Sequence, residues 1–150
     1  MARISVQAED FDVGAEFAAL RGARAGIGGI GCFVGTVRDN PRDRLVAMTL
    51  EHYPGMTEKE LARIEAEARE RWPLLDCLIV HRAGRLSAGD NIVLVITLSE
   101  HRHAAFEAAQ FLMDYLKTTA PFWKSEENGE ERHWVAPRDA DDAAAERWVR

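Results

Sequence analysis

The chain has 150 residues, of which 47% are apolar, and its formal net charge at pH 7 is −6. This length suits one domain with a buried core, so we expect a single domain over residues 1–150. The acidic balance argues against nucleic-acid binding, although a local basic cluster can still bind a small anion. No apolar run approaches the ~20 residues that span a bilayer, and Met1–Ser5 has no signal region. We therefore expect a cytoplasmic protein without membrane association.

The chain mixes strand-like and helix-like segments without a regular alternation. Apolar runs and alternation predict strands at residues 3–8, 30–38, 46–53, 75–81, 91–98, 122–127 and 130–135. Asn128-Gly129 between the last two of these strands predicts a C-terminal β-hairpin. Together, these strand-like and helix-like segments predict an α+β fold, with a mainly antiparallel or mixed sheet and helices packed on it.

Four helices are expected, and three of them have a candidate N-cap. Asp12 suits the N-cap of the first helix, and Thr57 with Glu60 has the spacing of a capping box for the second. Ser99 is the candidate cap of a long third helix that ends near Thr118. A short fourth helix is expected over residues 140–148.

Residues 26–31 spell G-x-G-x-x-G, the pattern of a dinucleotide-binding loop. In that motif the glycines follow a strand and open a helix, whose N-terminus meets the pyrophosphate. Here they follow a helix and open a strand, so the sequence favours a helix C-cap and a bend into the strand.

The two cysteines, Cys32 and Cys77, each lie in an apolar, strand-like stretch. The two cysteines are far apart in the sequence and form no C-x-x-C pattern, which argues against a disulfide framework or a zinc site. We expect both to be buried, reduced thiols. The histidines show no metal-binding spacing. The sequence therefore predicts neither a metal site nor a cofactor.

Several cations are candidates for binding an anion. His101 and Arg102 are expected at a helix N-terminus, where a bound anion would offset their unfavourable position, although both could simply face solvent. Lys117 near the end of the same helix has a sufficient structural explanation in the helix dipole. Lys124 follows Phe122-Trp123, where it is either a desolvated lysine suited to proton transfer or a surface lysine.

Seven segments together resemble the large subunit of molybdopterin synthase, the MoaE family. They are Phe33–Arg38, Leu50–Met56, Arg71–Pro73, His81–Gly84, Ser99–Arg102, Phe106–Ala108 and Met113–Lys124. The resemblance implies the α/β hammerhead fold of that family. It also implies sulfur transfer from the Gly-Gly thiocarboxylate of a small ubiquitin-like subunit to cyclic pyranopterin monophosphate, in a heterotetramer built on a dimer of large subunits.

The resemblance also implies the roles of individual residues. Lys117 and Lys124 would be the catalytic pair, and Phe33 and Met113 would form the pocket wall. Both lysines would also contact the substrate, together with Thr36, Val37, Arg38, His101, Arg102, Ser125, Glu126 and Arg138. The loop Asp39–Arg44 departs from the family pattern, which has Asn after the arginine and a glycine in the loop.

Three other interpretations compete with this one. A persulfide sulfurtransferase would use Cys32 or Cys77, and it needs an exposed thiol of low pKa. A non-catalytic module would bind a phosphorylated small molecule without turnover. A degenerate, structural family member is disfavoured by the presence of both lysines and of His101-Arg102.

Overall fold

The computed structural model of the chain describes residues 4–39, 46–120, 122–128, 131–135 and 139–149. Its strands are β1 (Ile4–Gln7), β2 (Gly29–Thr36), β3 (Ala47–His52), β4 (Leu74–Arg82), β5 (Gly84–Ser87), β6 (Asn91–Ser99), β7 (Phe122–Asn128) and β8 (Glu131–Val135). Its helices are α1 (Val13–Arg21), α2 (Met56–Arg71), α3 (Arg102–Thr118) and α4 (Asp139–Glu146). These elements confirm the predicted α+β class, and β5 is an additional strand where the sequence predicted a turn.

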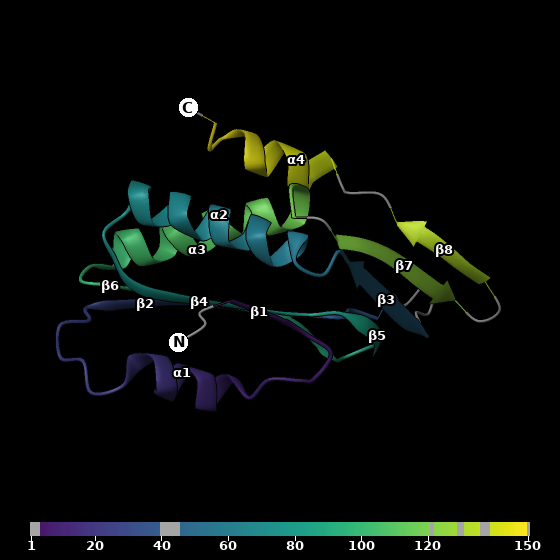
Figure 1. Cartoon of the computed structure of the whole chain (residues 1–150), viewed down its shortest axis with the longest axis horizontal. Helices are drawn as coiled ribbons and strands as arrows, with labels where there is room; N and C mark the ends of the chain where they lie inside the picture. The colour runs from purple at the N-terminus through teal and green to yellow at the C-terminus, as the bar shows by residue number, and fades with distance from the viewer. Residues whose placement is uncertain (1–3, 40–45, 121, 129–130, 136–138, 150) are drawn as a thin grey trace.

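The strands form two four-stranded sheets within the described ranges. Sheet A has the order β1-β4-β6-β2 and is mixed, because β1 is parallel to β4 while the other pairs are antiparallel. Sheet B has the order β5-β3-β7-β8 and is antiparallel. Figure 1 shows α2 and α3 on one face of sheet A, α1 on the opposite face, and sheet B at one end of the molecule.

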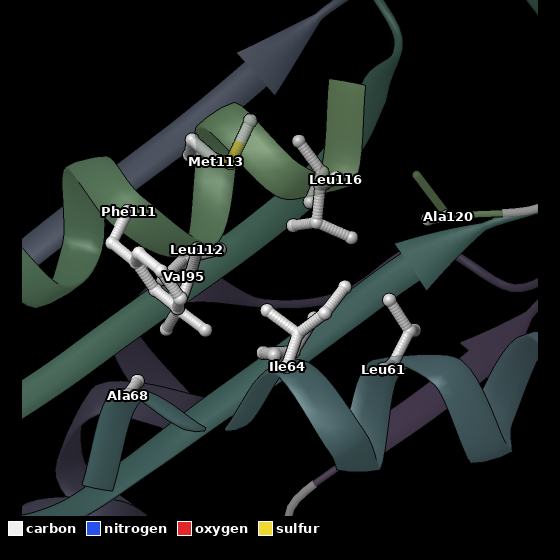
Figure 2. Packing of buried hydrophobic residues seen from close by; sticks show 11 residues of the cluster. Leu61, Ile64, Ala68, Val95, Phe111, Leu112, Met113, Leu116 and Ala120 are labelled. Atoms are coloured by element: carbon white, nitrogen blue, oxygen red, sulfur yellow. The ribbon is translucent and has the colours of Figure 1, made fainter. Parts of the chain in front are cut away.

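Both faces of sheet A are covered by apolar side chains. On the face below α2 and α3, a cluster of buried residues includes Leu61, Ile64, Phe111 and Leu112. Figure 2 shows Leu61 and Ile64 of α2 facing the side chains of α3. A second cluster lies between α1 and the other face. A third cluster joins the two sheets through Val37, Met48, Leu50 and Leu86.

The helix starts agree with the sequence in one case and differ in two. The Asp12 side chain accepts a hydrogen bond from the Ala15 N–H at 3.0 Å, which confirms it as the N-cap of α1. Helix α2 begins one residue before Thr57, and the Gly55 N–H donates to Glu58. The predicted pairing of Thr57 with Glu60 is therefore wrong, because the chain turns into the helix at Gly55, where φ is +86°.

The predicted N-cap of α3 is also wrong. Ser99 is the last residue of β6, and its hydroxyl donates to the Pro73 carbonyl at 3.1 Å. His101 occupies the N-cap position without a capping side-chain hydrogen bond. Because β6 continues one residue further than its apolar pattern suggested, through Ser99, the helix starts only at Arg102. None of the described helices is both long and apolar enough to cross a bilayer.

The glycine-rich segment has a packing role different from the predicted helix cap. Helix α1 ends at Gly22, with φ +56°, before that segment begins. Gly28 and Gly31 instead lie against the start of α3, where an added Cβ would come within 1.9 Å of the Glu100 oxygen and 2.6 Å of the Ala105 oxygen. The glycines open a strand, as expected, and allow close contact between β2 and α3.

Cys77 is buried as predicted, but the prediction for Cys32 is wrong because its side chain is exposed. β2 is an edge strand of sheet A, and α1 packs over β4 and β6. The face of β2 that carries Cys32 is therefore incompletely covered. The C-terminal hairpin is confirmed by the pairing of Asn128 with Glu131, whereas the loop 40–45 and the turn 129–130 lie outside the described residues.

Candidate active site

A pocket of about 700 Å³ lies where sheets A and B meet the end of α3. Sheet A contributes residues of β2, β4 and β6, and sheet B contributes residues of β3, β7 and β8. The lining includes Phe33, Thr36, Arg38, Leu50, His81, Met113, Lys117, Phe122, Lys124 and Asp141. A pocket of this volume suits a small-molecule ligand.

The two predicted catalytic lysines come together in this pocket. Lys117 lies in the last turn of α3, and Lys124 lies on β7 opposite Leu50 of β3. The chain leaves α3 at Thr118 and enters β7 at Phe122, so the helix end and the strand carry the lysines to the same cavity. Arg38 adds a third cation beyond the end of β2. Asp141 of α4 supplies the carboxylate among the described lining residues, so the lining favours an anionic ligand.

The predicted wall residues also lie at the pocket. Phe33 lines it from β2 with 43% of its surface exposed, and Met113 lines it from α3 while remaining buried in the main core. Thr36 lies at the end of β2 on the same lining. An exposed aromatic ring in a pocket lined by three cations provides a flat apolar surface for a planar ligand.

His81 is a pocket residue that sequence reasoning did not identify. It lies near the end of β4, is 7% exposed, and stacks on the Phe122 ring with centroids 3.8 Å apart. Burial lowers the pKa of His81 to about 4, and the charges of Lys117 and His52 act in the same direction. The available signal was a lone histidine near the end of a mainly apolar strand, which is equally typical of a core residue whose hydrogen bonds are satisfied.

Other predicted substrate contacts do not line this pocket. His101 and Arg102 are exposed at the opposite end of α3. Lys117 follows His101 by 16 residues, so a rise of about 1.5 Å per residue separates them by about 24 Å along the helix. Val37 is buried in the cluster that joins the sheets. Ser125 and Glu126 follow Lys124 on β7 but are not lining residues, and Arg138 lies outside the described residues.

Neither cysteine is placed to act in the pocket. The pKa of Cys77 is raised to about 12, mainly because the thiol is buried. Burial also raises the pKa of Cys32. Cys32 precedes Phe33 on β2, so its side chain points to the opposite face of the sheet. Among the described residues, no three His, Cys, Asp or Glu side chains lie close enough together to hold a metal ion.

The comparisons with known proteins agree with this architecture. The model of the family described as "MoaE protein" matches residues 6–119. A protein of Pseudomonas aeruginosa named molybdopterin synthase catalytic subunit is 55% identical over 146 residues, which cover 97% of each chain. One of Mesorhizobium japonicum with the same name is 53% identical, over 97% of this chain and 92% of the relative.

A solved structure extends the agreement to the fold. The molybdopterin biosynthesis MoaE protein from Burkholderia ambifaria is 55% identical and superposes with a TM-score of 0.83, over 99% of this chain and 98% of that one. The superposition therefore includes the segments that form both sheets. The chain belongs to the MoaE protein family.

Proposed function

We propose that this chain is the catalytic subunit of a molybdopterin synthase. Its substrate is cyclic pyranopterin monophosphate, into which two rounds of sulfur transfer introduce the dithiolene of molybdopterin. The observation that carries the proposal is the meeting of Lys117, Lys124 and Arg38 in one pocket. The names and the high identity of the relatives support the same reaction.

The cations have a clear task in this chemistry. The sulfur donor is a thiocarboxylate anion, and it must approach a substrate that already carries a phosphate. Positive side chains in a partly desolvated pocket lower this repulsion and stabilise the charge that develops on oxygen. Opening the cyclic phosphate produces an alkoxide-like leaving oxygen, which a lysine ammonium can protonate or pair. Lys117 and Lys124 are the two candidates for this role.

The sulfur must arrive on a second molecule. No cysteine is among the described residues that line the pocket, and neither thiol of the chain has a lowered pKa. A small ubiquitin-like subunit with a C-terminal Gly-Gly thiocarboxylate meets this need, because a slender tail can enter the pocket. Two free cysteines that do not pair with each other also fit a reducing, cytoplasmic location.

A second copy of the chain completes the proposed substrate site. His101 and Arg102 lie about 24 Å along α3 from Lys117, so one chain does not bring them to its own pocket. We therefore place the start of α3 of one chain at the pocket of its partner in a symmetric dimer. Arg138, Ser125 and Glu126 remain proposed substrate contacts.

The chain offers a matched control for a test of the lysines. It has three lysines, and the third, Lys59, is exposed on α2 away from the pocket. Molybdopterin formation would be measured with a thiocarboxylated small subunit and cyclic pyranopterin monophosphate. We expect Lys117→Ala and Lys124→Ala each to lower the rate by about 100-fold or more, because each removes a cation from the reacting anions. Lys59→Ala should retain the wild-type rate.

Two outcomes would contradict the proposal. If the wild-type chain binds the pterin but forms no product under conditions where a known synthase does, the chain is a binding module. If both pocket variants fold and retain the wild-type rate, the lysines are not the catalytic groups. Thermal unfolding of each variant separates loss of activity from loss of the fold.

A further inference from the structure

One carboxylate lines a pocket whose other charged side chains, among the described residues, are cations. Asp141 of α4 shares the lining with Arg38, Lys117 and Lys124. Its side chain is partly buried, and within the described ranges no ion pair or hydrogen bond joins it to any of these three cations. A carboxylate repels the phosphate that the cations would bind. Asp141 therefore weakens anion binding unless it contacts another part of the ligand.

The position of Asp141 in its helix does not account for its place in the pocket. Acidic residues in the first turn of a helix complement the helix dipole, and α4 begins at Asp139. Asp142, the next residue, supplies the same charge to the same turn from an exposed position outside the lining. The dipole explains an acidic first turn, but it does not require one of these carboxylates to line the pocket.

Contacts beyond the other end of α4 fix the segment that carries this carboxylate. Helix α4 packs against α3 (Figure 1). Trp148, which follows α4, donates its indole N–H to Asp114 of α3 at 2.6 Å and packs edge-on against Phe111. Lys117 lies about one helical turn after Asp114 on α3. The same stretch of α3 therefore holds both Lys117 and the segment with Asp141.

The polarity of the proposed substrate matches this arrangement. The phosphate lies at one end of the molecule, and the pyrimidine ring of the pterin lies at the other. That ring presents its 2-amino group and its N3–H side by side, as two hydrogen-bond donors. The two oxygens of a carboxylate accept such a pair, as they accept the paired N–H groups of a guanidinium. Phe33 in the same lining offers an exposed ring to the flat ligand.

We propose that Asp141 determines the specificity of the pocket for a pterin, because its carboxylate accepts hydrogen bonds from the 2-amino group and the N3–H of the ring. The three cations are left for the phosphate end. The inference rests on the proposed function, which names the pterin. It concerns binding and not the sulfur-transfer step, so the two can be tested separately.

Asp141→Asn and Asp142→Asn are a matched pair of variants. Both remove one negative charge from the same turn of α4, and only the first changes the pocket lining. In Asp141→Asn, one accepting oxygen becomes an amide donor that opposes a donor of the pterin. By isothermal titration calorimetry, we expect cyclic pyranopterin monophosphate to bind Asp141→Asn about 10-fold to 100-fold more weakly than the wild type. Asp142→Asn should bind it as the wild type does.

Inorganic phosphate separates ring recognition from simple charge. It lacks the ring, so it should bind Asp141→Asn at least as tightly as the wild type, because a repelling charge is gone. If Asp141 acted by its charge alone, the substrate would also bind the variant more tightly. Weaker substrate binding without weaker phosphate binding therefore identifies a contact with the ring.

A change of ring tests the hydrogen-bond pattern directly. Lumazine, the 2-oxo counterpart of pterin, keeps the N3–H but has an acceptor in place of the 2-amino donor. At pH 7, we expect pterin to displace the substrate from the wild type at a concentration about tenfold lower than lumazine does. Asparagine carries one donor and one acceptor, so Asp141→Asn should lose or reverse this preference.

The outcomes separate this inference from the proposed function. If the wild type turns over but Asp141→Asn binds the substrate as tightly as Asp142→Asn or more tightly, the inference is overturned. If the affinities change as expected while the wild type makes no product with a thiocarboxylated small subunit, ring recognition holds and the proposed function fails. If Asp141→Asn does not fold, the ring preference of the wild type decides, and a wild type that does not prefer pterin overturns the inference. A wild type that does not bind the substrate contradicts both.

Discussion

At the scale of single residues, burial keeps two side chains of β4 in their neutral forms. Cys77 and His81 lie on the same face of the strand, four residues apart. Burial raises the pKa of the Cys77 thiol to about 12 and lowers the pKa of the His81 imidazole to about 4. The raised pKa keeps Cys77 protonated and therefore a weak nucleophile at neutral pH. The lowered pKa leaves His81 as a neutral imidazole in the pocket lining. The same physical cause thus disfavours the persulfide mechanism and keeps His81 uncharged at neutral pH.

The His81 shift predicts a pH dependence of stability. The pKa is 6.5 for an ordinary histidine and about 4 in the fold, so the unfolded chain binds more protons between these values. Stability must therefore fall as pH falls from 6.5 toward 4, by at most about 1.4 kcal/mol per pH unit from this group. Urea unfolding at several pH values should show a steeper loss for the wild type than for His81→Gln, which cannot titrate. Parallel curves would mean that His81 is not buried as a neutral base.

At the scale of elements, the buried carboxylate of Asp114 on α3 binds the C-terminal segment through a hydrogen bond. Asp114 accepts hydrogen bonds from the Gln110 amide at 2.9 Å and from the Trp148 indole N–H at 2.6 Å. The Trp148 ring packs edge-on against Trp72 and Phe111. Helix α4 just before it carries Asp141, which lines the pocket. The contact therefore stabilises both the fold and one wall of the site.

Removal of the indole N–H tests this contact. Trp148→Phe keeps an aromatic ring but leaves the Asp114 carboxylate without its closest donor. We expect the free energy of unfolding to fall by about 2 kcal/mol, as for the loss of a hydrogen bond to a charged group. Denaturant unfolding would measure the change, with Val149→Ala, at a 72% exposed residue, as the control. Equal stability of Trp148→Phe and the control would show that the segment is held by ring packing alone.

At the scale of the whole molecule, the site spans more than one layer of the fold. Sheet A, sheet B and the end of α3 each contribute part of the pocket lining. The start of α3, with His101 and Arg102, lies at the far end of the helix. If these residues serve the pocket of a partner chain, two defective chains should complement each other. This makes the proposed dimer testable without a structure of it.

A mixture of two inactive variants tests the shared site. Lys117→Ala and Arg102→Ala chains would be unfolded together, refolded as mixed dimers and assayed for molybdopterin. Random pairing makes half of the dimers mixed, and each mixed dimer has one site with both residues intact. About a quarter of all sites should therefore recover activity. A mixture no more active than its components would show that a partner chain does not supply Arg102 to the site that contains Lys117.

The sequence determined the local features of this protein. Asp12 as a helix cap, the end of α3 near Thr118, the C-terminal hairpin and the α+β class all follow from interactions within a few residues. The block Met113–Lys124 carries the family resemblance, and it places both lysines on consecutive elements. At Thr57 and Ser99 the predicted helix start was misplaced, because α2 begins from a glycine of positive φ and β6 extends through Ser99.

Only the tertiary structure decided which residues meet. The pairing of β3 with β7 sets Lys124 opposite Leu50, and the end of β4 brings His81 to the same cavity as Lys117. Cys32 is exposed because β2 lies at the edge of sheet A, and an apolar run looks the same in an edge strand as in a central one. Strand order is a long-range property, fixed by contacts between segments far apart in the chain. The sequence therefore identified the lysines, whereas only the fold showed the pocket and placed His81 in its lining.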